Sequence, residues 1–514
     1  MTKQMIWHVA RRIKSSLPEA RRQPLRPIAS AAVLFAATCV GGCVLDWEVP
    51  DATVETPAAF RAARPKSAPP IPSGSDWAAE FRSPELTHIV EQALAQNLDI
   101  AAAVARVEQA DAQARISSSA LWPNLNMNNI AERVQIPGTL TPSNGRPSSP
   151  TRVNFFQLGL TASYEIDFWG KNHDASNAAR LLADASRFDC DVVAIATVVS
   201  VVNSYFLILA TQDRIGIAHN NIRIAEAALG AIKGRLDVGA ATALDYWQQE
   251  SIVAGLRAQV PPLEETLRQT QNILAVLLAV PPESVNFKGG SLTRLHFPEL
   301  KPGLPSELLL RRPDISAVEA SLVSQQFSVL QARAAFFPSI QMTGLYGVQS
   351  VALKTLFRPD AIAWQIAGNL TQPLFDGYNL QGQFMLQKGR YAELAQDYKK
   401  QILTAFSDTE NALIAIAETS RQLKLQVDAV IAARHAYEAE HARLMEGVID
   451  IAALSITETT LFQNEDLLAL VRLAYFQAAT SLFQAVGGGW SDRERLLENA
   501  SEKAAYEVDK GPWP

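Results

Sequence analysis

The sequence is poor in cysteine, which limits how the fold can be held together. Its 514 residues contain three cysteines, Cys39, Cys43 and Cys190. Cys39 lies in a segment with the features of a cleaved leader, and Cys190 lies in an apolar helical stretch where a thiol most often packs as a small side chain. No disulfide framework is expected in the mature chain. Noncovalent packing must therefore stabilise the fold.

The sequence also lacks the motifs by which many enzymes are recognised. It contains no GxxxxGK[ST] phosphate loop, no GxSxG nucleophile turn and no metal-spaced Cys/His cluster. His435, Glu438 and His441 are spaced like metal ligands, but they belong to a charged helical segment and fit a solvated face. Because no nucleophile, base and metal converge, we expect no enzymatic activity, no metal and no cofactor.

Positive charge is scarce outside the N-terminus. The whole chain has a formal net charge of -6, and residues 1–42 hold seven Lys/Arg against one Glu, so the rest of the chain is clearly acidic. An acidic chain is a poor match for a polyanion. Nucleic acid is not an expected partner.

The N-terminus resembles a bacterial lipoprotein signal. A basic stretch, 1–27, precedes an apolar run, 28–40, that is too short to span a bilayer, and Val40-Gly41-Gly42-Cys43 resembles a lipobox. Cleavage would leave Cys43 with N-palmitoyl and S-diacylglycerol groups, and Val44 after it favours the outer membrane. The alternative is an ordinary thiol in a leader that is cut elsewhere. We assign 1–42 to the signal peptide and the following Pro/Ala-rich segment, 43–82, to a lipidated tether.

The chain repeats its pattern after about 210 residues. The spacing from Asp99 to Pro123 equals that from Asp314 to Pro338, and two further motif pairs follow in the same order. This order predicts an internal two-fold repeat. We place the two repeats at 83–304 and 305–489, with a polar tail at 490–514.

Each repeat contains two segments with the alternation of amphipathic strands. We predict strands at about 124–136 and 153–168 in the first repeat and at about 339–350 and 361–375 in the second. Their length suits tilted membrane-spanning strands. Four strands cannot close a barrel, and strands in hydrocarbon need a closed sheet, so we expect several copies to combine. Three copies give twelve strands.

Two proline-free segments predict very long helices. Heptad-spaced apolar residues run through 174–237, and the same register appears from Phe406 to Val430. About 60 residues span about 90 Å, which exceeds a compact domain. Shorter return helices follow at about 243–280 and 451–486. We expect a break in the first of them at Pro261 and Pro262.

Several motifs together resemble a known family. Trp77 and Phe81 ahead of Ser83-Pro84-Glu85-Leu86 resemble the opening of the TolC-like outer-membrane factors. Segments 164–170 (YEIDFWG) and 372–377 (QPLFDG) are similar to the strand motifs of its NodT-like or OprM-like lipoprotein branch. The resemblance covers about 77–490.

The resemblance implies a fold and a function. The fold is a mixed α+β membrane protein: a trimeric, 12-stranded outer-membrane β-barrel continuing into a long periplasmic α-helical coiled-coil barrel. The function is that of a passive exit duct for drugs, metals or other small molecules in a tripartite efflux system. Its implied partners are two further copies, a periplasmic adapter, an inner-membrane pump of the resistance-nodulation-division type and outer-membrane lipid. A type I protein-secretion duct and a lipid-anchored periplasmic coiled-coil scaffold are the alternatives.

The family also implies roles for the helix tips. By resemblance the tips contact the adapter, and the matching residues are Arg235, Leu236, Gly239, Arg443, Leu444 and Gly447. The two glycines also fit plain helix caps. Asp245 and Asp450 are gate candidates, with ordinary solvated loop residues as the alternative. The segment 454–458 (LSITE) departs from the Leu-Asp-Ala of many relatives, so the gate assignment is not settled by the motif.

Overall fold

The computed structural model describes residues 47, 49–57, 59–61, 75–137, 139, 149–284, 287–298, 311–446 and 451–488. The chain divides into residues 1–50 and residues 51–514. The signal peptide and Cys43 lie outside the described residues, as do Gly447, Asp450 and the tail from 489. All elements below belong to residues 51–514.

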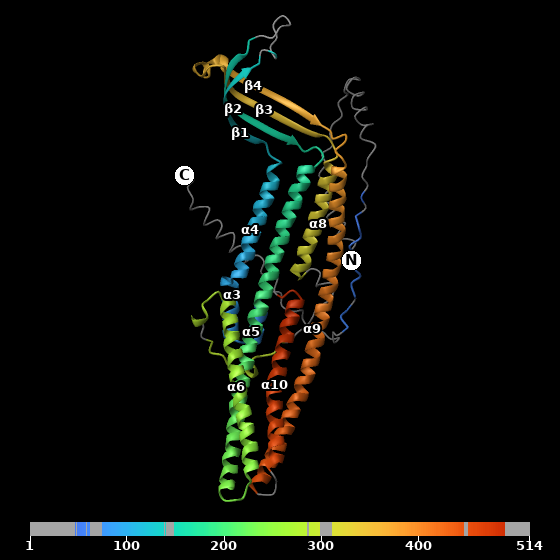
Figure 1. Cartoon of the computed structure of the whole chain (residues 1–514). Coiled ribbons are helices and arrows are strands. Elements are labelled where there is room, and N and C mark those ends of the chain that lie inside the picture. The colour runs from blue at the N-terminus through green and yellow to red at the C-terminus, as the bar shows by residue number, and fades with distance from the viewer. Residues whose placement is uncertain are drawn as a thin grey trace. The chain divides into compact units, whose positions relative to one another are not determined.

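Four strands form one antiparallel sheet in the order β1-β2-β3-β4 (Figure 1). They are β1 (Asn124–Ile136), β2 (Thr151–Ile166), β3 (Ser339–Ser350) and β4 (Ile362–Thr371). The two hairpins are joined by pairing of β2 with β3, from Phe156 opposite Ser350 to Ile166 opposite Ile340. β2 ends two residues before, and β4 four residues before, the ends expected from the sequence. The hairpins therefore form a single sheet.

The helices come in matched lengths. Helices α4 (Leu98–Ser119) and α8 (Pro313–Ala334) have 22 residues each. Helices α5 (Lys171–Asp237) and α9 (Asn379–Met445) have 67 each, and α6 (Ala243–Leu277) and α10 (Ile451–Ala485) have 35 each. At 1.5 Å per residue, each 67-residue helix is about 100 Å long. α5 packs against α4, α6, α8 and α10, and α9 packs against α8 and α10.

Among the described residues, two helices are long and apolar enough to cross a membrane. They are α5 and residues 453–485 of α10. About half of each apolar window is buried against other helices, including Val201 and Phe206 of α5. Helix packing accounts for this apolarity.

The expected helix break at Pro261 and Pro262 is wrong, because α6 runs through both prolines. Both are exposed, so the carbonyls that lose an amide donor, four residues earlier, lie on a helix face open to water. The φ that proline imposes is itself helical. Val260 is buried and holds this turn against the neighbouring helices.

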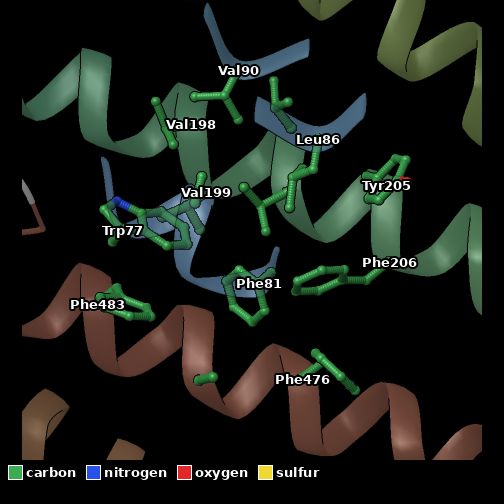
Figure 2. Packing of buried hydrophobic residues seen from close by; sticks show 14 of the residues in the cluster. Trp77, Phe81, Leu86, Val90, Val198, Val199, Tyr205, Phe206, Phe476 and Phe483 are labelled. Atoms are coloured by element: carbon green, nitrogen blue, oxygen red, sulfur yellow. The ribbon is translucent and has the colours of Figure 1, made fainter. Parts of the chain in front are cut away.

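A cluster of aromatic side chains joins the N-terminal elements to the long helices (Figure 2). Trp77 in η1 (Ser75–Phe81) stacks on Phe483 of α10 at 4.6 Å, and Phe81 meets Phe206 of α5 edge to face at 4.9 Å. Leu86 of α3 (Pro84–Gln96) is fully buried in the same cluster. Stacked and edge-to-face pairs stabilise beyond the area they bury. The motif around Trp77 and Phe81, which resembles the start of the family's sequences, thus lies at the centre of the core.

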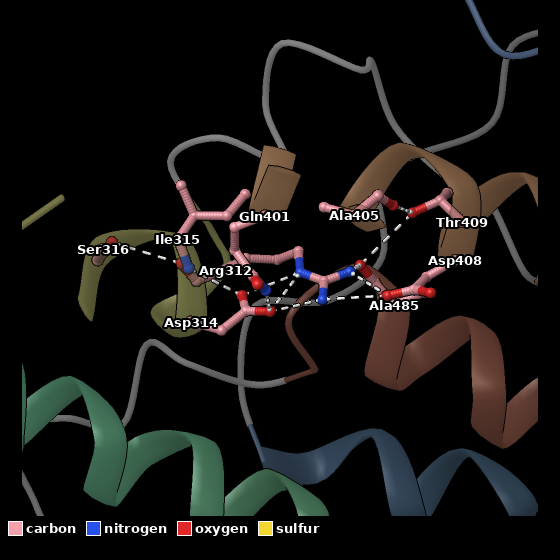
Figure 3. A network of polar contacts seen from close by, with 9 residues as sticks. All are labelled: Arg312, Asp314, Ile315, Ser316, Gln401, Ala405, Asp408, Thr409 and Ala485. Carbon is pink, nitrogen blue, oxygen red and sulfur yellow. Dashed lines mark hydrogen bonds and ion pairs between the residues drawn. The ribbon is translucent and has the colours of Figure 1, made fainter. Parts of the chain in front are cut away.

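A buried ion-pair network fixes the start of α8 (Figure 3). The Arg312 guanidinium donates to Asp314 at 2.6 Å, to Asp408 of α9 at 3.3 Å and to the Ala485 carbonyl at the end of α10 at 3.1 Å. Gln401 of α9 donates to Asp314 at 2.6 Å. Burial alone would raise the pKa of Asp314, but Arg312 and Gln401 hold that pKa below its usual range. One arginine therefore connects three helices.

Replacing Arg312 by methionine should lower the free energy of unfolding by about 3 kcal/mol, because Asp314 would keep a buried charge without its cation. The loss should shrink as the pH falls below about 4, since the lowered pKa of Asp314 stabilises only while the carboxylate is ionised. Denaturant titration of the detergent-solubilised protein at pH 7 and pH 3.5 measures both effects.

The matched control is Arg268→Met, which removes an exposed ion pair with Glu264. Such pairs contribute less than about 1 kcal/mol. Equal losses in the two variants would show that the Arg312 network has no special role.

Candidate functional site

One face of the sheet is apolar and uncovered. The cross-strand register places Leu160 opposite Tyr346, and Tyr346 opposite Trp364, so their side chains share a face. The apolar side chains of this face that are at least a third exposed are Leu125, Met127, Leu160, Ile166, Met342, Tyr346, Ile362, Trp364, Ile366 and Leu370. No described element covers them. A surface of this size needs an apolar environment.

The opposite face is mostly polar, although Ile130 and Val134 of β1 also lie on it. Gln349 of β3 donates to Gln157 of β2 at 3.0 Å, and Asn128 of β1 donates to Thr161 of β2 at 2.9 Å. Side chains of this kind suit contact with water. The sheet thus has one face suited to lipid and one suited to an aqueous lumen, as the alternation in the sequence predicted.

Aromatic side chains collect where the sheet meets the helices. Trp122, Phe168, Phe375 and Tyr378 are each at least 70% exposed and lie two to seven residues from a strand end. Trp169 is fixed there, because its indole donates to the Pro338 carbonyl at 2.8 Å. Exposed aromatic residues are enriched at the boundary between hydrocarbon and water. This end of the sheet therefore has the composition of a membrane interface.

A pair of carboxylates lies at the same junction. Asp167 accepts a hydrogen bond from the His173 amide at 2.7 Å, and Asp174 occupies the first turn of α5. Burial and the charge of Asp167 raise the pKa of Asp174 to about 6, against a smaller opposing effect of His173. The junction is therefore less stable when both aspartates are ionised.

At the far end of the helices, the tip of the α5–α6 hairpin is closed by a glycine cap. Gly239 has a φ of 76°, and the Ala240 amide donates to the Arg235 carbonyl at 2.7 Å. The positive φ of Gly239 is the left-handed backbone conformation that favours glycine just after a helix end. The Arg235 guanidinium donates to the Leu444 carbonyl of α9 at 3.1 Å. Arg235 thus caps the last turn of the other long helix and connects the two tips.

The tip residues of α9 differ in exposure. Leu444 is 3% exposed and packs against Ile232 and Leu454, whereas Arg443 is exposed and pairs with Glu440 at 3.2 Å. Leu236 is half-buried. Leu444 thus supports the tip from inside, and Arg443 is available at its surface. The predicted adapter-contact residue Gly447 and the gate candidate Asp450 lie outside the described residues.

The gate candidate Asp245 caps the start of α6. Its carboxylate accepts from the Thr242 amide at 2.7 Å and the Thr242 hydroxyl at 2.8 Å, and its own amide donates back to Thr242. This is a reciprocal capping box. The interactions of Asp245 within the described chain are therefore local.

An exposed apolar group beside the tips was missed by the sequence analysis. Leu244, Trp247 and Ile456 are each about two thirds exposed and line a hollow of about 520 Å³ between α6 and α10. The spacing of Leu244 and Trp247 on one helix face was the available signal. Exposed tryptophan is common at binding surfaces.

The uncovered sheet face and the long helices define a class of protein, the outer-membrane channels that continue into helical bundles. Known structures share the fold. This chain matches the open state of the MtrE outer-membrane channel of Neisseria gonorrhoeae with a TM-score of 0.76 at 26% identity. The match covers 87% of this chain and 98% of that channel. The CmeC channel of Campylobacter jejuni has a TM-score of 0.79 at 23% identity, covering 89% of this chain and 97% of that one.

The sequence profile of the outer membrane efflux protein family matches residues 89–280 and again residues 304–488. The chain is also 36% identical to the pyoverdine export outer membrane protein OpmQ of Pseudomonas aeruginosa, over 82% of this chain and 89% of the relative. It belongs to the outer membrane efflux protein family. It is an outer-membrane channel of the efflux type, and the family resemblance read from the sequence is confirmed.

Asp174→Asn should raise the thermal unfolding midpoint at pH 8 and leave it unchanged at pH 4. The raised pKa of Asp174 costs stability only above the ordinary aspartate pKa, and this cost is complete once the pH exceeds about 6. Thermal melts of the detergent-solubilised protein at both pH values test this. Glu108→Gln, an exposed change on α4, is the control, and an equal shift at pH 4 and pH 8 would contradict the assignment.

Proposed function

We propose that three copies of this chain form a continuous duct, with a twelve-stranded barrel in the outer membrane and a helical barrel in the periplasm. The observation that carries the proposal is the sheet with one uncovered apolar face and two unpaired edges, β1 and β4. In hydrocarbon each edge would leave backbone amides and carbonyls without partners. Pairing of β1 with β4 of the next copy satisfies both edges, and three copies give a closed barrel of ordinary size.

The matched helices support an internal two-fold repeat. Equal lengths of 22, 67 and 35 residues recur in order, and the same family profile fits each half. Six repeats in three chains would then surround one axis. The exposed apolar side chains of α9, such as Leu403 and Ile414, and those of α6, such as Ile273, would pack between copies.

The duct would act passively. An inner-membrane pump would supply the energy, and a periplasmic adapter would bind at the tips through Arg443 and the hollow around Trp247. The cargo would be small molecules, the class to which the pyoverdine exported by the OpmQ relative belongs. Cys43 would carry the N-palmitoyl and S-diacylglycerol groups.

A lipid-anchored scaffold without a pore explains less of the structure. It accounts for the helices, yet it provides no cover for the apolar face of the sheet. A type I secretion duct would use the same barrel, and the pump beside it would decide the cargo.

Ile366→Arg tests the duct directly, because Ile366 lies mid-strand on the apolar face and is 72% exposed in the single chain. Placing arginine against lipid should cost about 2–4 kcal/mol per subunit. We expect loss of heat-modifiable trimers from outer-membrane extracts and loss of single-channel conductance in planar bilayers.

The control is Gln365→Arg, one residue away on the polar face. It should keep the trimer and change only conductance or ion selectivity. If the purified mature protein is monomeric and soluble without detergent when unacylated, the duct is ruled out.

Asp450→Ala tests the gate candidate. Three copies of Asp450 around one axis would form an acidic ring, and its removal should raise single-channel conductance by relieving the constriction. Asp237→Ala, at the end of α5, is the comparison. Unchanged conductance and ion selectivity would exclude Asp450 from the gate.

A further inference from the structure

A glutamate is fully buried between the two tip hairpins. Glu458 of α10 and Gln249 of α6 are both 0% exposed, ten or eleven residues beyond their tip glycines. The Gln249 amide donates to Glu458 Oε2 at 3.1 Å and to the Ala225 carbonyl of α5 at 3.3 Å. One contact therefore links the α5–α6 hairpin to the α9–α10 hairpin.

Two oxygens of this contact have no hydrogen-bond partner. They are Glu458 Oε1 and Gln249 Oε1, and both are buried. Two acceptors cannot satisfy each other, whereas a protonated carboxyl supplies one donor. A proton on Glu458 Oε1 would turn one of these two unpartnered acceptors into a donor. An ionised Glu458 would instead be a buried charge with a single amide donor, which is costly.

Among the described residues, no lysine, arginine or histidine forms an ion pair with Glu458. On α5, Glu226 pairs with Arg257 of α6 at 2.6 Å. On α9, Arg434 pairs with Glu465 of α10 at 2.5 Å, and Arg443 pairs with Glu440 at 3.2 Å. Burial and then the charge of Glu458 raise the pKa of Tyr437 on α9, and the Tyr437 ring lies 5.7 Å from that of His441. Burial raises the pKa of Glu458, and the Gln249 hydrogen bond only partly opposes this.

We propose that Glu458 is a proton-operated latch: with a proton on its carboxyl it holds the two tip hairpins together, and loss of that proton loosens them. The latch rests on the proposed duct, because loosening the tips matters only if the tips close a pore. Between the ordinary glutamate pKa and the raised pKa of Glu458, the latched state binds more protons than the loosened state. Latching is therefore strongest at low pH and weakens as the pH rises from the ordinary glutamate range to the raised pKa of Glu458.

The first experiment detects the proton itself and is independent of any channel activity. Infrared titration of the full-length protein in detergent should show a protonated carboxyl band that persists above the pH at which exposed glutamates ionise. Because Asp174 also has a raised pKa, the test is the difference between variants: part of the band should be lost in Glu458→Gln, and the whole band should be kept in Glu438→Gln, an exposed carboxylate on α9 with 60% side-chain exposure. Absence of a band specific to Glu458 would overturn the latch whatever the channel does.

The second experiment measures the consequence. In planar bilayers, wild-type conductance should rise with pH on the tip side, and Glu458→Gln, which keeps the shape of the neutral acid, should lose this dependence and stay low. Glu438→Gln should behave as wild type. Retained pH dependence in Glu458→Gln would overturn the latch. Absence of conductance in every variant would instead count against the duct, and the infrared titration would then be the test of whether Glu458 is protonated.

Amide hydrogen exchange across α6 and α10 provides a third measurement that does not need a pore. Exchange near residues 249 and 458 should accelerate with pH in wild type beyond the intrinsic chemical rate. In Glu458→Gln only the intrinsic increase should remain. Equal profiles in the two proteins would contradict loosening of the tips.

Discussion

The unpaired backbone at the two edges of a four-stranded sheet is the constraint on which the rest of the structure depends. In water those edges could be solvated, but the apolar face that includes Tyr346, Trp364 and Ile366 requires a surrounding of lipid. Lipid offers no hydrogen bonds, so the edges must be paired by protein. The subunit is therefore incomplete by itself in a membrane, and the proposed duct completes it by pairing these edges with neighbouring copies.

Much of the fold was predictable because its periodicities are long and regular. Strand alternation and heptad spacing are repeated many times, so errors at single positions average out, and the strand and helix ranges agree with the sequence within a few residues. The exception is the Pro261-Pro262 pair. Local propensity favoured a break there, but the exposed position on α6 lets water satisfy the freed carbonyls, and packing of Val260 keeps the helix continuous.

The site was less predictable because it depends on which residues meet across the two halves. Motif matching assigned Leu444 to the adapter contact and Asp245 to the gate. The structure adds that Leu444 is buried in the tip and that Asp245 caps its own helix. Glu458 was noted only as a departure from the family pattern. Its burial against Gln249 joins residues 209 positions apart, and no local pattern reports such a contact.

The equal lengths of α5 and α9, and of α6 and α10, bear on how such chains can change. Removing one heptad from α5 alone would draw its end about 10 Å away from the end of α9 and separate Arg235 from the Leu444 carbonyl. Insertions and deletions in these helices must therefore be compensated in all four at once. Point substitution is the easier route to variation here, whereas the loops beyond the strands can vary in length independently.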